Sequence, residues 1–519
     1  MQRQRMLDQA KNKPGYFDVI IIGGGATGLG AAVDSASRGY STLLLEQHDF
    51  AKGTSSRSTK LVHGGVRYLQ QGNVTLVLEA LRERGLLIQN APHLVRNQSF
   101  IVPNYDWWEG PFYGVGMKVY DMLAGKLGLG PSKNLSLKET IKHLPTLEQE
   151  GLRGGVIYYD GQFDDSRMAV NLAQTAAEHG ALLVNYAKVT GLIKSNNMVD
   201  GVAVRDQLTG DEFELNARVV VNATGVFTDN VLKMDDQEAR TMIAPSQGVH
   251  LVIDKEFSPG ESAIMVPHTD DGRVLFAVPW NGKIVVGTTD TPVDDPDLEP
   301  KAMEEEIDFI LKHATQYLTG NPTRKDVRSV FAGLRPLVKA GDGKDTASLS
   351  RDHTLIVSKS GLVTITGGKW TTYRKMAQDT IDQAATVAGL NVQECVTENL
   401  RIHGWLKNVD KEDPLYHYGS DRVEIEKLIK EKPELGEKLH ERLPYLKAEV
   451  IWGVRNEMAM TVEDVLSRRT RALLLDAQAS VDAAREVAEL MAGEMEQNGD
   501  WIAQQVKEYE ALADAYILK

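Results

Sequence analysis

A glycine-rich turn near the start of the 519-residue chain has the residue types that hold a diphosphate. Gly23, Gly25 and Gly28 follow the apolar run 17–22 and precede a small-residue helical pattern. The first glycine permits a tight turn, the second lets backbone N–H groups approach a pyrophosphate, and the third lets the helix pack on the strand. Glu46 follows the next apolar run, and its carboxylate can accept hydrogen bonds from ribose hydroxyls. The pattern predicts a dinucleotide site without distinguishing NAD from FAD.

Hydroxyl and cationic side chains crowd the segment that follows this unit. Residues 53–68 read Gly-Thr-Ser-Ser-Arg-Ser-Thr-Lys-Leu-Val-His-Gly-Gly-Val-Arg-Tyr. Hydroxyls and backbone N–H groups in such a loop can hold phosphate oxygens or the edge of a flavin. A solvated linker rarely continues into a histidine, two glycines, an arginine and a tyrosine, so His63, Arg67 and Tyr68 are candidate site residues.

Three further side chains are candidates for substrate binding or catalysis because of their type and their position in the sequence. Arg335 precedes Pro336, which stiffens the turn, and its planar guanidinium suits a phosphate. Lys369 follows two glycines at a helix start, a poor position for a cation unless it has a function there. His250 opens a strand, and histidine is a common general base near neutral pH. His63 is the alternative base.

Composition excludes several classes of protein. Lys plus Arg is 58 and Asp plus Glu is 72, so the formal net charge is −14, which argues against nucleic-acid binding. An anionic substrate must then be captured by a local cluster of cations. Cys395 is the only cysteine, so neither an intrachain disulfide nor a multi-cysteine metal site is expected, and no metal site is predicted. The first fifteen residues carry no apolar signal segment, and no stretch of about 18 apolar residues predicts a membrane-spanning helix.

The pattern of elements predicts a mixed α/β protein with a helical C-terminal part. Apolar runs and helical stretches alternate up to about residue 385, and charged helical sequence without strands dominates from about residue 421. We expect Thr461 and Asp464 to open one helix and Ser480 to cap another. The boundary between the two parts is placed near 385–400.

Several separate motifs together resemble the FAD-dependent glycerol-3-phosphate dehydrogenases. The N-terminal dinucleotide unit with a later strand ending in Ala-Thr-Gly is similar to flavoproteins of the glutathione-reductase type. The resemblance runs from about residue 17 into the C-terminal helices, and one departure, Ser-Thr-Lys at 58–60 for the commoner Ser-Ser-Lys, keeps the hydroxyl. The motifs that carry it are residues 54–68, 246–250, 332–336, 350–352, 367–374 and, in the C-terminal part, 463–471.

The resemblance implies a fold and a domain order. The fold is a glutathione-reductase-like FAD-binding Rossmann domain with an interleaved mixed-sheet substrate domain and a C-terminal helical domain. The oxidoreductase region is expected over 15–385 and the helical domain over 390–519. FAD-binding segments are expected at about 17–75, 150–245 and 345–385, and substrate-binding segments at about 76–149 and 246–344.

The resemblance also implies a reaction and roles. The enzyme would oxidise sn-glycerol 3-phosphate to dihydroxyacetone phosphate by hydride transfer from C2 to FAD and pass the electrons to a membrane quinone. Arg335 and Arg67, beside Tyr68, would hold the phosphate, Lys369 would stabilise developing charge, and His250 would accept the proton, with His63 or Arg335 as alternatives. The residues expected to bind FAD are Gly23, Gly24, Gly25, Ala26, Thr27, Gly28, Glu46, Gln47, Thr54, Ser55, Ser56, Ser58, Lys60, Leu61, Gly64, Gly65, Ala223, Gly225, Gly333, Gly368, Lys369 and Thr371.

Quinone reduction implies contact with lipid, so we expect a cytoplasmic protein bound peripherally to the inner face of the cytoplasmic membrane. Two stretches could provide that contact, residues 107–129 with their tryptophans and lysines, and the helix from about Trp370. A homodimer is compatible with the sequence. The alternatives are a glycerol-3-phosphate oxidase that uses oxygen, another FAD-dependent amine or amino-acid oxidase, and a non-catalytic binding protein on the same fold.

Overall fold

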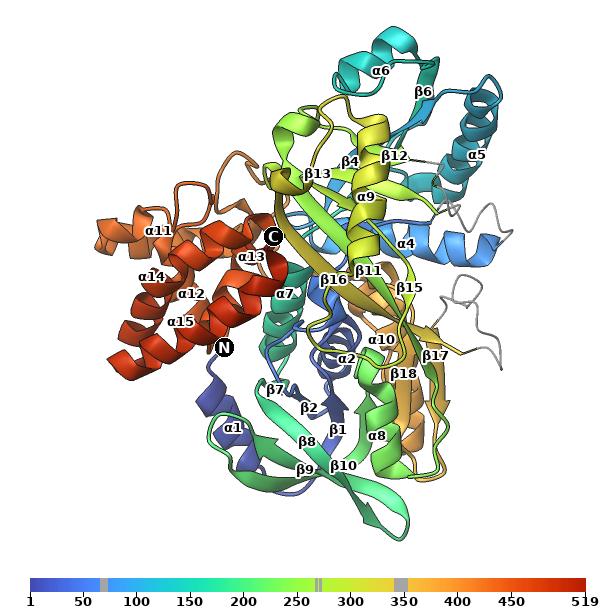
Figure 1. Cartoon of the computed structure of the whole chain (residues 1–519). Coiled ribbons are helices and arrows are strands. Elements are labelled where there is room, and N and C mark those ends of the chain that lie inside the picture. The colour runs from blue at the N-terminus through green and yellow to red at the C-terminus, as the bar shows by residue number, and fades with distance from the viewer. Residues whose placement is uncertain (66–72, 267–268, 270–272, 340–352) are drawn as a thin grey trace.

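The computed structural model describes residues 1–65, 73–266, 269, 273–339 and 353–519. Arg67, Tyr68 and the motif at 350–352 therefore lie outside the described residues. Two mixed sheets lie one above the other, and helices of the C-terminal part pack along one side (Figure 1).

The first sheet contains eight strands of the described chain, ordered β17-β18-β10-β1-β2-β7, with β8 and β9 extending it from β10. Its centre is parallel, with β1 between β10 and β2, and β18 and β7 on the outer sides. Strands buried on both faces are continuous apolar runs, which is why the sequence shows them clearly. The bounds are β1 (Phe17–Ile22), β2 (Thr42–Leu45), β7 (Leu182–Val184), β8 (Ala187–Ser195), β9 (Met198–Asp206), β10 (Glu212–Asn222), β17 (His353–Val357) and β18 (Val363–Gly367).

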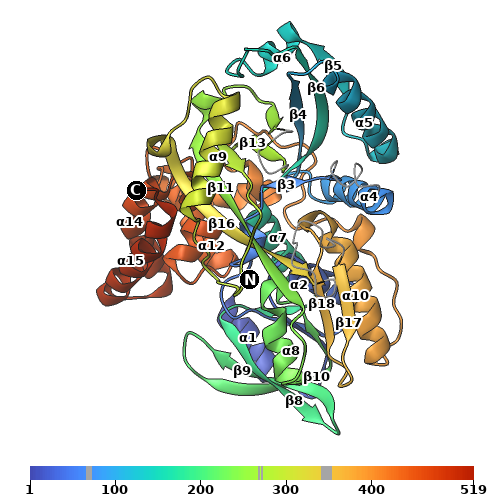
Figure 2. The same cartoon turned by 45° about the vertical axis from the view of Figure 1, so that its right-hand side comes forward.

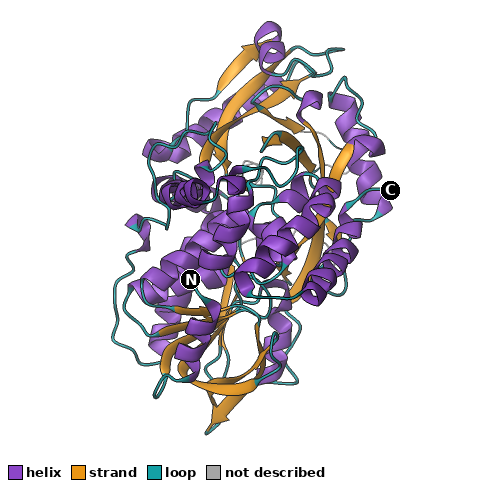
Figure 3. Cartoon of the chain, turned by 90° about the vertical axis from the view of Figure 1, so that its left-hand side faces the viewer, coloured by secondary structure: helices purple, strands orange, loops and turns teal. Residues whose placement is uncertain are grey.

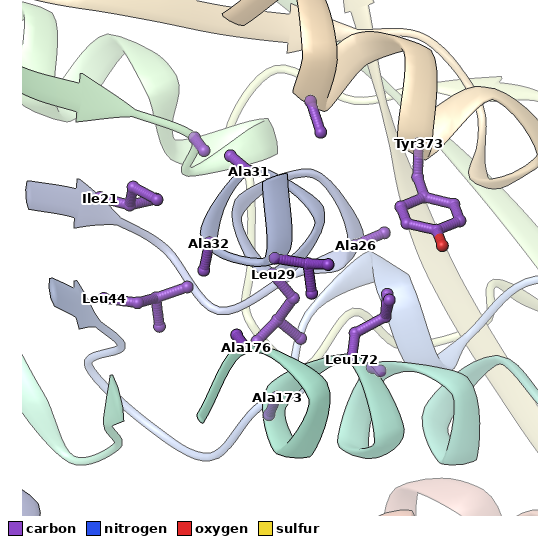
Figure 4. Packing of buried hydrophobic residues seen from close by; sticks show 14 of the residues in the cluster. Ile21, Ala26, Leu29, Ala31, Ala32, Leu44, Leu172, Ala173, Ala176 and Tyr373 are labelled. Atoms are coloured by element: carbon purple, nitrogen blue, oxygen red, sulfur yellow. The ribbon is translucent and has the colours of Figure 1, made fainter. Parts of the chain in front are cut away.

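Helices cover both faces of this sheet. One face packs against α2 (Ala26–Ser37), α7 (Asp165–Glu178) and α10 (Tyr373–Val387), and the other against α1 (Arg3–Lys11) and α8 (Thr228–Asp235). Figure 4 shows α2 side chains packed between strand residues and α7. The small residues of α2 allow this close approach, which places the start of the helix against the end of β1.

The second sheet contains ten strands of the described chain. Its strands are β3 (Leu61–Val62), β4 (Arg96–Asn104), β5 (Lys133–Ser136), β6 (Gly154–Gln162), β11 (Ile243–Asp254), β12 (Ala263–Val266), β13 (Leu275–Trp280), β14 (Lys283–Gly287), β15 (Thr291–Pro292) and β16 (Val327–Val338). β3 and β6 belong to this sheet, although the segments expected to bind FAD include them. Its helices are α4 (Val74–Asn90), α5 (Glu109–Ala124), α6 (Leu137–His143) and α9 (Glu304–Tyr317), and α4 lies beside α5 in both views (Figure 2).

The two faces of β11 meet different partners, because side chains alternate along a strand. Val249, Leu251 and Ile253 pack with α9, whereas Val252 packs with the C-terminal helices. His250 has the parity of Val252, so it shares the face that those helices approach.

The C-terminal helices are α11 (Arg422–Glu431), α12 (Lys447–Asn456), α13 (Ala472–Leu475), α14 (Ala477–Met495) and α15 (Gly499–Ala513). Figure 3 shows them covering one side of the molecule. Their apolar core continues into the second sheet through Trp280 and Phe331. The tight contact between these regions was not evident from the change in composition along the chain.

Two expected helix starts have different outcomes. The hydroxyl of Thr461 accepts from the N–H of Asp464, and the Asp464 carboxylate accepts from the N–H of Thr461, as predicted, but the segment Asp464–Arg469 is a short π-helix. The expectation for Ser480 is wrong, because Ser480 lies inside α14. Asp476 caps that helix by accepting from the N–H of Ala479 at 2.9 Å, so an acidic residue four positions earlier replaces the predicted hydroxyl.

Candidate active site

The ends of four strands meet at one edge of the first sheet. Gly23 follows β1, Glu46 follows β2, Ala223 follows β10 and Gly368 follows β18. These strands are parallel, so their carboxyl ends lie along the same edge. Since β1 is flanked by β10 on one side and β2 on the other, this edge has the topology at which open α/β sheets bind ligands. A cavity of about 480 Å³ opens here.

The glycines of the first turn have distinct structural roles. A Cβ on Gly28 would lie 1.9 Å from the carbonyl oxygen of Gly23, so only glycine lets α2 begin this close to β1. The N–H of Gly24 donates to the Glu46 carboxylate at 2.6 Å, which fixes Glu46 beside the turn. Burial raises the pKa of Glu46, opposed by the N–H groups of Gly24 and His48 that hydrogen-bond to it.

A second cavity, of about 710 Å³, lies beside the first. The residues common to both linings are Thr54, Pro336, Gly367, Gly368, Lys369 and Trp370. One part of the larger cavity is polar, around His250, Arg335 and Lys369. The other is apolar and aromatic, lined by Leu61, Phe100, Trp108, Phe112, Tyr113, Tyr158, Met265, Val274 and Phe276.

Arg335 lies on β16 opposite Ser246 of β11. Its guanidinium donates to the Thr289 carbonyl at 2.9 Å and to the Thr288 hydroxyl at 3.2 Å, and it pairs with Asp290 at 3.2 Å. A Cβ on Gly248 would lie 2.5 Å from Nη2 of Arg335, so glycine at that position leaves the room that the guanidinium occupies. The arginine is thereby held at the cavity wall with its side chain 23% exposed.

His250 is buried at the wall of the same cavity. Its Nε2 lies 2.9 Å from the Thr59 hydroxyl, and its ring stacks on Phe331 with centroids 4.8 Å apart. Nδ1 has no hydrogen-bond partner among the described residues. Burial, reinforced by the charges of Lys60 and Arg335, lowers the pKa of His250 well below its usual range, so the imidazole is neutral at pH 7.

Lys369 and His63 complete the polar group. Lys369 follows Gly367 and Gly368, whose φ angles are 78° and 72°, and this glycine turn carries the chain out of β18 along both cavities. The N–H of His63 donates to the hydroxyl of Thr371 at 3.1 Å, which ties the two loops together. The structure therefore gathers His63, His250, Arg335 and Lys369 around one cavity.

Most residues expected to bind the cofactor also line the cavities. The smaller cavity is lined by Gly23, Gly25, Ala26, Thr27, Glu46, Gln47, Thr54, Ser55, Ala223, Gly225, Gly368 and Lys369. The larger cavity is lined by Thr54, Ser58, Leu61, Gly65, Gly333, Gly368, Lys369 and Thr371.

Five expected residues line neither cavity: Gly24, Gly28, Ser56, Lys60 and Gly64. Gly24 and Gly28 shape the turn instead, and the N–H of Gly64 donates to the hydroxyl of Tyr120. The amine of Lys60 is buried inside the protein, against the Asp165 carboxylate at 2.7 Å and the Ser56 carbonyl at 2.8 Å. Its charge therefore serves an internal ion pair.

Several lining residues escaped the sequence reasoning. Arg57, Arg273, Asp160 and Asp290 line the larger cavity. Asp290 ends a polar run, Thr-Thr-Asp, directly after β14. This position after a strand was the feature of the sequence that could have identified Asp290 as a site residue. Asp160 lies within the apolar strand β6 and pairs with Arg84, which is distant in sequence, so periodicity alone gave no indication of it.

The expected membrane segments differ in exposure. Trp107 is 77% exposed, and Phe112, Val115 and Met122 are also exposed on or beside α5. The second stretch does not fit the expectation, because Arg374 of α10 is buried and bound to Glu83 at 2.7 Å. Within the described residues, no helix has both the length and the apolar character needed to cross a bilayer, and no cluster of three or more His, Cys, Asp or Glu side chains has a metal-binding arrangement.

Comparisons with known proteins cover nearly the whole chain. The family model described as FAD dependent oxidoreductase matches residues 18–374. A second, described as the C-terminal domain of alpha-glycerophosphate oxidase, matches residues 360–501. These matches confirm the predicted fold class and the recognition of an FAD-dependent oxidoreductase.

Individual proteins agree with the family models. The mitochondrial glycerol-3-phosphate dehydrogenase of Mus musculus is 42% identical over 95% of this chain and 72% of its own length. The crystal structure of a glycerol-3-phosphate dehydrogenase from Bacillus halodurans, complexed with FAD, is 30% identical with a TM-score of 0.81, over 99% of this chain and 97% of that chain. The L-alpha-glycerophosphate oxidase of Mycoplasma pneumoniae shares the fold at 17% identity and a TM-score of 0.58, over 76% of this chain and 100% of that chain.

Proposed function

The chain belongs to the FAD-dependent glycerol-3-phosphate dehydrogenase family, and from this premise we propose that it oxidises sn-glycerol 3-phosphate to dihydroxyacetone phosphate. FAD, when bound, supplies the acceptor for the hydride that leaves C2 of the substrate. The observation that carries the proposal is the grouping of Arg335, His250 and Lys369 around the polar part of the larger cavity, where it adjoins the strand-end cavity.

The residues at the strand ends fit FAD. The turn at Gly23 and Gly25 and the start of α2 would hold the diphosphate, and Glu46 would accept from ribose hydroxyls. Residues 367–370 line both cavities, so a flavin ring at this junction would face the cationic groups. The smaller cavity would hold the nucleotide half of FAD, and residues 367–370 would lie beside the ring.

Arg335 holds the substrate phosphate in this proposal. The guanidinium is fixed by Thr288, Thr289 and Asp290, so little orientation is lost when an anion binds. Guanidinium groups bind phosphate through parallel N–H donors. Since the whole molecule carries a net charge of −14, this local positive group is what attracts the dianion.

His250 accepts the proton of the substrate hydroxyl. The neutral ring carries a lone pair on one nitrogen and can act as a base, and its contact with the Thr59 hydroxyl fixes the ring at the cavity wall. Lys369 stabilises negative charge that develops during the transfer, and the loss of such a contact typically raises the barrier by about 2–4 kcal/mol. His63, on the same wall, is the alternative proton acceptor.

The electrons pass to a membrane quinone in this proposal, with α5 as the lipid contact on the inner face of the cytoplasmic membrane. The aromatic end of the larger cavity includes Trp108 and Phe112, so the exposed apolar face of α5 continues into the cavity wall. Lys118 is exposed on the same helix, and helices that lie in the membrane interface carry such basic residues on their polar side. An apolar acceptor could reach the site along this face.

Vesicle binding tests the membrane contact. A variant with Trp107→Ser and Val115→Ser should sediment less with anionic vesicles and lose the gain in quinone reduction that lipid gives. Val392→Ser is the matched control, because Val392 is 85% exposed on another part of the chain. Equal vesicle binding by all three proteins would refute the assignment of α5.

We also propose the domain division given by the motifs. The parallel sheet with α2, α7 and α10 forms the cofactor unit, the second sheet forms most of the substrate unit, and residues 390–519, with α11 to α15, form the third unit. Each unit has its own apolar core, although the third shares its core with β11, β13, β14 and β16.

A substrate panel tests the reaction. Holoenzyme should reduce an electron-accepting dye with sn-glycerol 3-phosphate and yield dihydroxyacetone phosphate, with little turnover of glycerol, glycine or proline. Turnover of amino acids in place of the phosphate ester would contradict the proposal. Stoichiometric hydrogen peroxide formation in air would indicate an oxidase.

A further inference from the structure

A buried carbonyl in the active-site loop is held by a residue from the C-terminal helical region. The Ser56 carbonyl accepts from the amine of Lys60 at 2.8 Å and from the guanidinium of Arg471 at 2.6 Å. Ser56 lies between Ser55, whose hydroxyl accepts from the first N–H of α2, and Thr59, which contacts His250. The loop 54–60 is therefore connected to both the cofactor turn and the proposed base.

The Asp165 carboxylate binds the same loop from the other side. It accepts from the N–H and hydroxyl of Ser58 at 2.9 and 2.7 Å, and from the amine of Lys60 at 2.7 Å. Arg471 donates to its second oxygen at 3.0 Å. Lys60, Asp165 and Arg471 are all buried, so these bonds are shielded from water.

Lys60, which bonds to Asp165 and Ser56, is also connected to His250 through the ring of Phe331. The Lys60 amine lies 5.2 Å from the centre of the Phe331 ring, and that ring stacks on the His250 imidazole. Arg471 directly precedes α13, which packs beside β16, the strand that carries Phe331 (Figure 1). A shift of the C-terminal helices would thus move the contacts on both sides of the imidazole.

The backbone at both cations is held in an unfavourable conformation. Lys60 and Arg471 have φ angles of 64° and 67°, in the left-handed region that residues with a Cβ rarely adopt. Such conformations persist where the surroundings determine them, and they are concentrated at functional sites.

We propose that Arg471 is a positioning residue of the active site: it holds Ser56 and Asp165, and so fixes the loop that places Thr59 against His250. Its effect on turnover depends on the proposed function, whereas its effect on the loop does not. The C-terminal helical region is then part of the active-site support, although it lines neither cavity.

The test compares Arg471→Gln and Arg471→Lys with Arg167→Gln. Arg167 forms a buried ion pair with Glu457 and also joins α7 to the C-terminal part, but it makes no described hydrogen bond with loop 54–60. Arg471→Gln and Arg167→Gln both lose a buried charge, so both should lower Tm. Hydrogen–deuterium exchange of peptides covering residues 53–62 measures the loop in the holoenzyme, and steady-state kinetics with a dye acceptor give kcat and KM.

We expect Arg471→Gln to speed exchange at residues 58 and 60 by about tenfold or more, with residues 477–495 unchanged. Arg471→Gln should lower kcat about tenfold, because a general base that is less well positioned loses part of its contribution to the rate. KM should change less than about threefold. Arg471→Lys keeps one donor and should lie between Arg471→Gln and the native enzyme, and it carries the test if the glutamine variant does not fold. Arg167→Gln should leave both the loop exchange and kcat near native values.

Three results would overturn the proposal. Unchanged exchange at 58 and 60 in the Arg471 variants would show that the loop does not depend on Arg471. Equal changes in Arg167→Gln would show a general loss of structure. Faster exchange with native kcat would show that the held loop does not position the catalytic group. A native enzyme that fails to oxidise glycerol 3-phosphate would refute the proposed function, and the exchange data would still decide whether Arg471 fixes the loop.

Discussion

Replacing Arg335 with alanine should weaken substrate binding strongly. The guanidinium is mostly buried and held by Asp290, Thr288 and Thr289, so it lies at the cavity wall in a fixed orientation. Hydrogen bonds to charged groups contribute about 1.5–3 kcal/mol each. Loss of a paired contact with a phosphate dianion, taken as about 3 kcal/mol, corresponds to an increase in KM on the order of a hundredfold. The change in kcat should be smaller, about tenfold at most, because the base and Lys369 remain.

The loss of Arg335 also removes the positive charge beside the Asp290 carboxylate. Asp290, only 9% exposed, would face the incoming anion once Arg335 is removed. The double variant Arg335→Ala with Asp290→Asn should therefore recover part of the lost affinity, which a dye-coupled assay over a wide range of glycerol 3-phosphate will measure. Arg324→Ala, which removes an arginine paired with Glu304 and Asp308 away from the cavities, is the control. A KM within about threefold of the native value for Arg335→Ala would refute the phosphate-binding role.

Three further perturbations test neighbouring parts of the account. Gly248→Ala places a Cβ 2.5 Å from Nη2 of Arg335, so KM should rise while FAD absorbance per protein stays native; an unchanged KM would mean that the guanidinium is not fixed there. Thr59→Val removes the hydroxyl that contacts His250, so kcat should fall about tenfold with little change in KM; native kcat would exclude His250 as the base held by Thr59. Burial alone would lower the pKa of His403, but its hydrogen bonds to Asp421 and Glu178 raise it to about 9. Because the folded-state value exceeds the unfolded one, this stabilisation is complete below about pH 6.5 and is lost as pH rises through about 9, amounting to about 3 kcal/mol at most. Tm should therefore fall more between pH 6.5 and 9 in the native protein than in His403→Gln, and parallel curves would contradict the assignment.

The cofactor edge could be predicted because its residues act locally. Gly23, Gly25 and Gly28 must stand at fixed offsets after a buried strand, and Glu46 must end the next one. Strands buried on both faces are apolar runs that need no partner to be recognised, which explains why the parallel sheet was visible in the sequence. Lys369 was identified for a similar reason, since two glycines after a strand mark a close approach of backbone.

The rest depended on partners distant in sequence. Lys60 lies in a loop rich in hydroxyls and was expected at the cofactor. Its amine instead donates to Asp165, which also accepts from Arg471. These partners lie more than a hundred and more than four hundred positions from Lys60 in the sequence. The Ser480 prediction followed the hydroxyl rule for helix caps, whereas the helix begins earlier and Asp476 caps it by accepting from the N–H of Ala479. The packing of the C-terminal helices on the second sheet also rests on long-range apolar contacts, through Trp280 and Phe331, which composition cannot reveal.

Anaerobic addition of sn-glycerol 3-phosphate to the purified holoenzyme tests the central claim most directly. A cationic pocket beside the bound flavin predicts that the flavin absorbance near 450 nm bleaches, by about one flavin per substrate molecule, and that Arg335→Ala needs far more substrate for the same bleaching. A flavin that stays oxidised at high substrate concentration, or that bleaches equally in both proteins, would contradict the account.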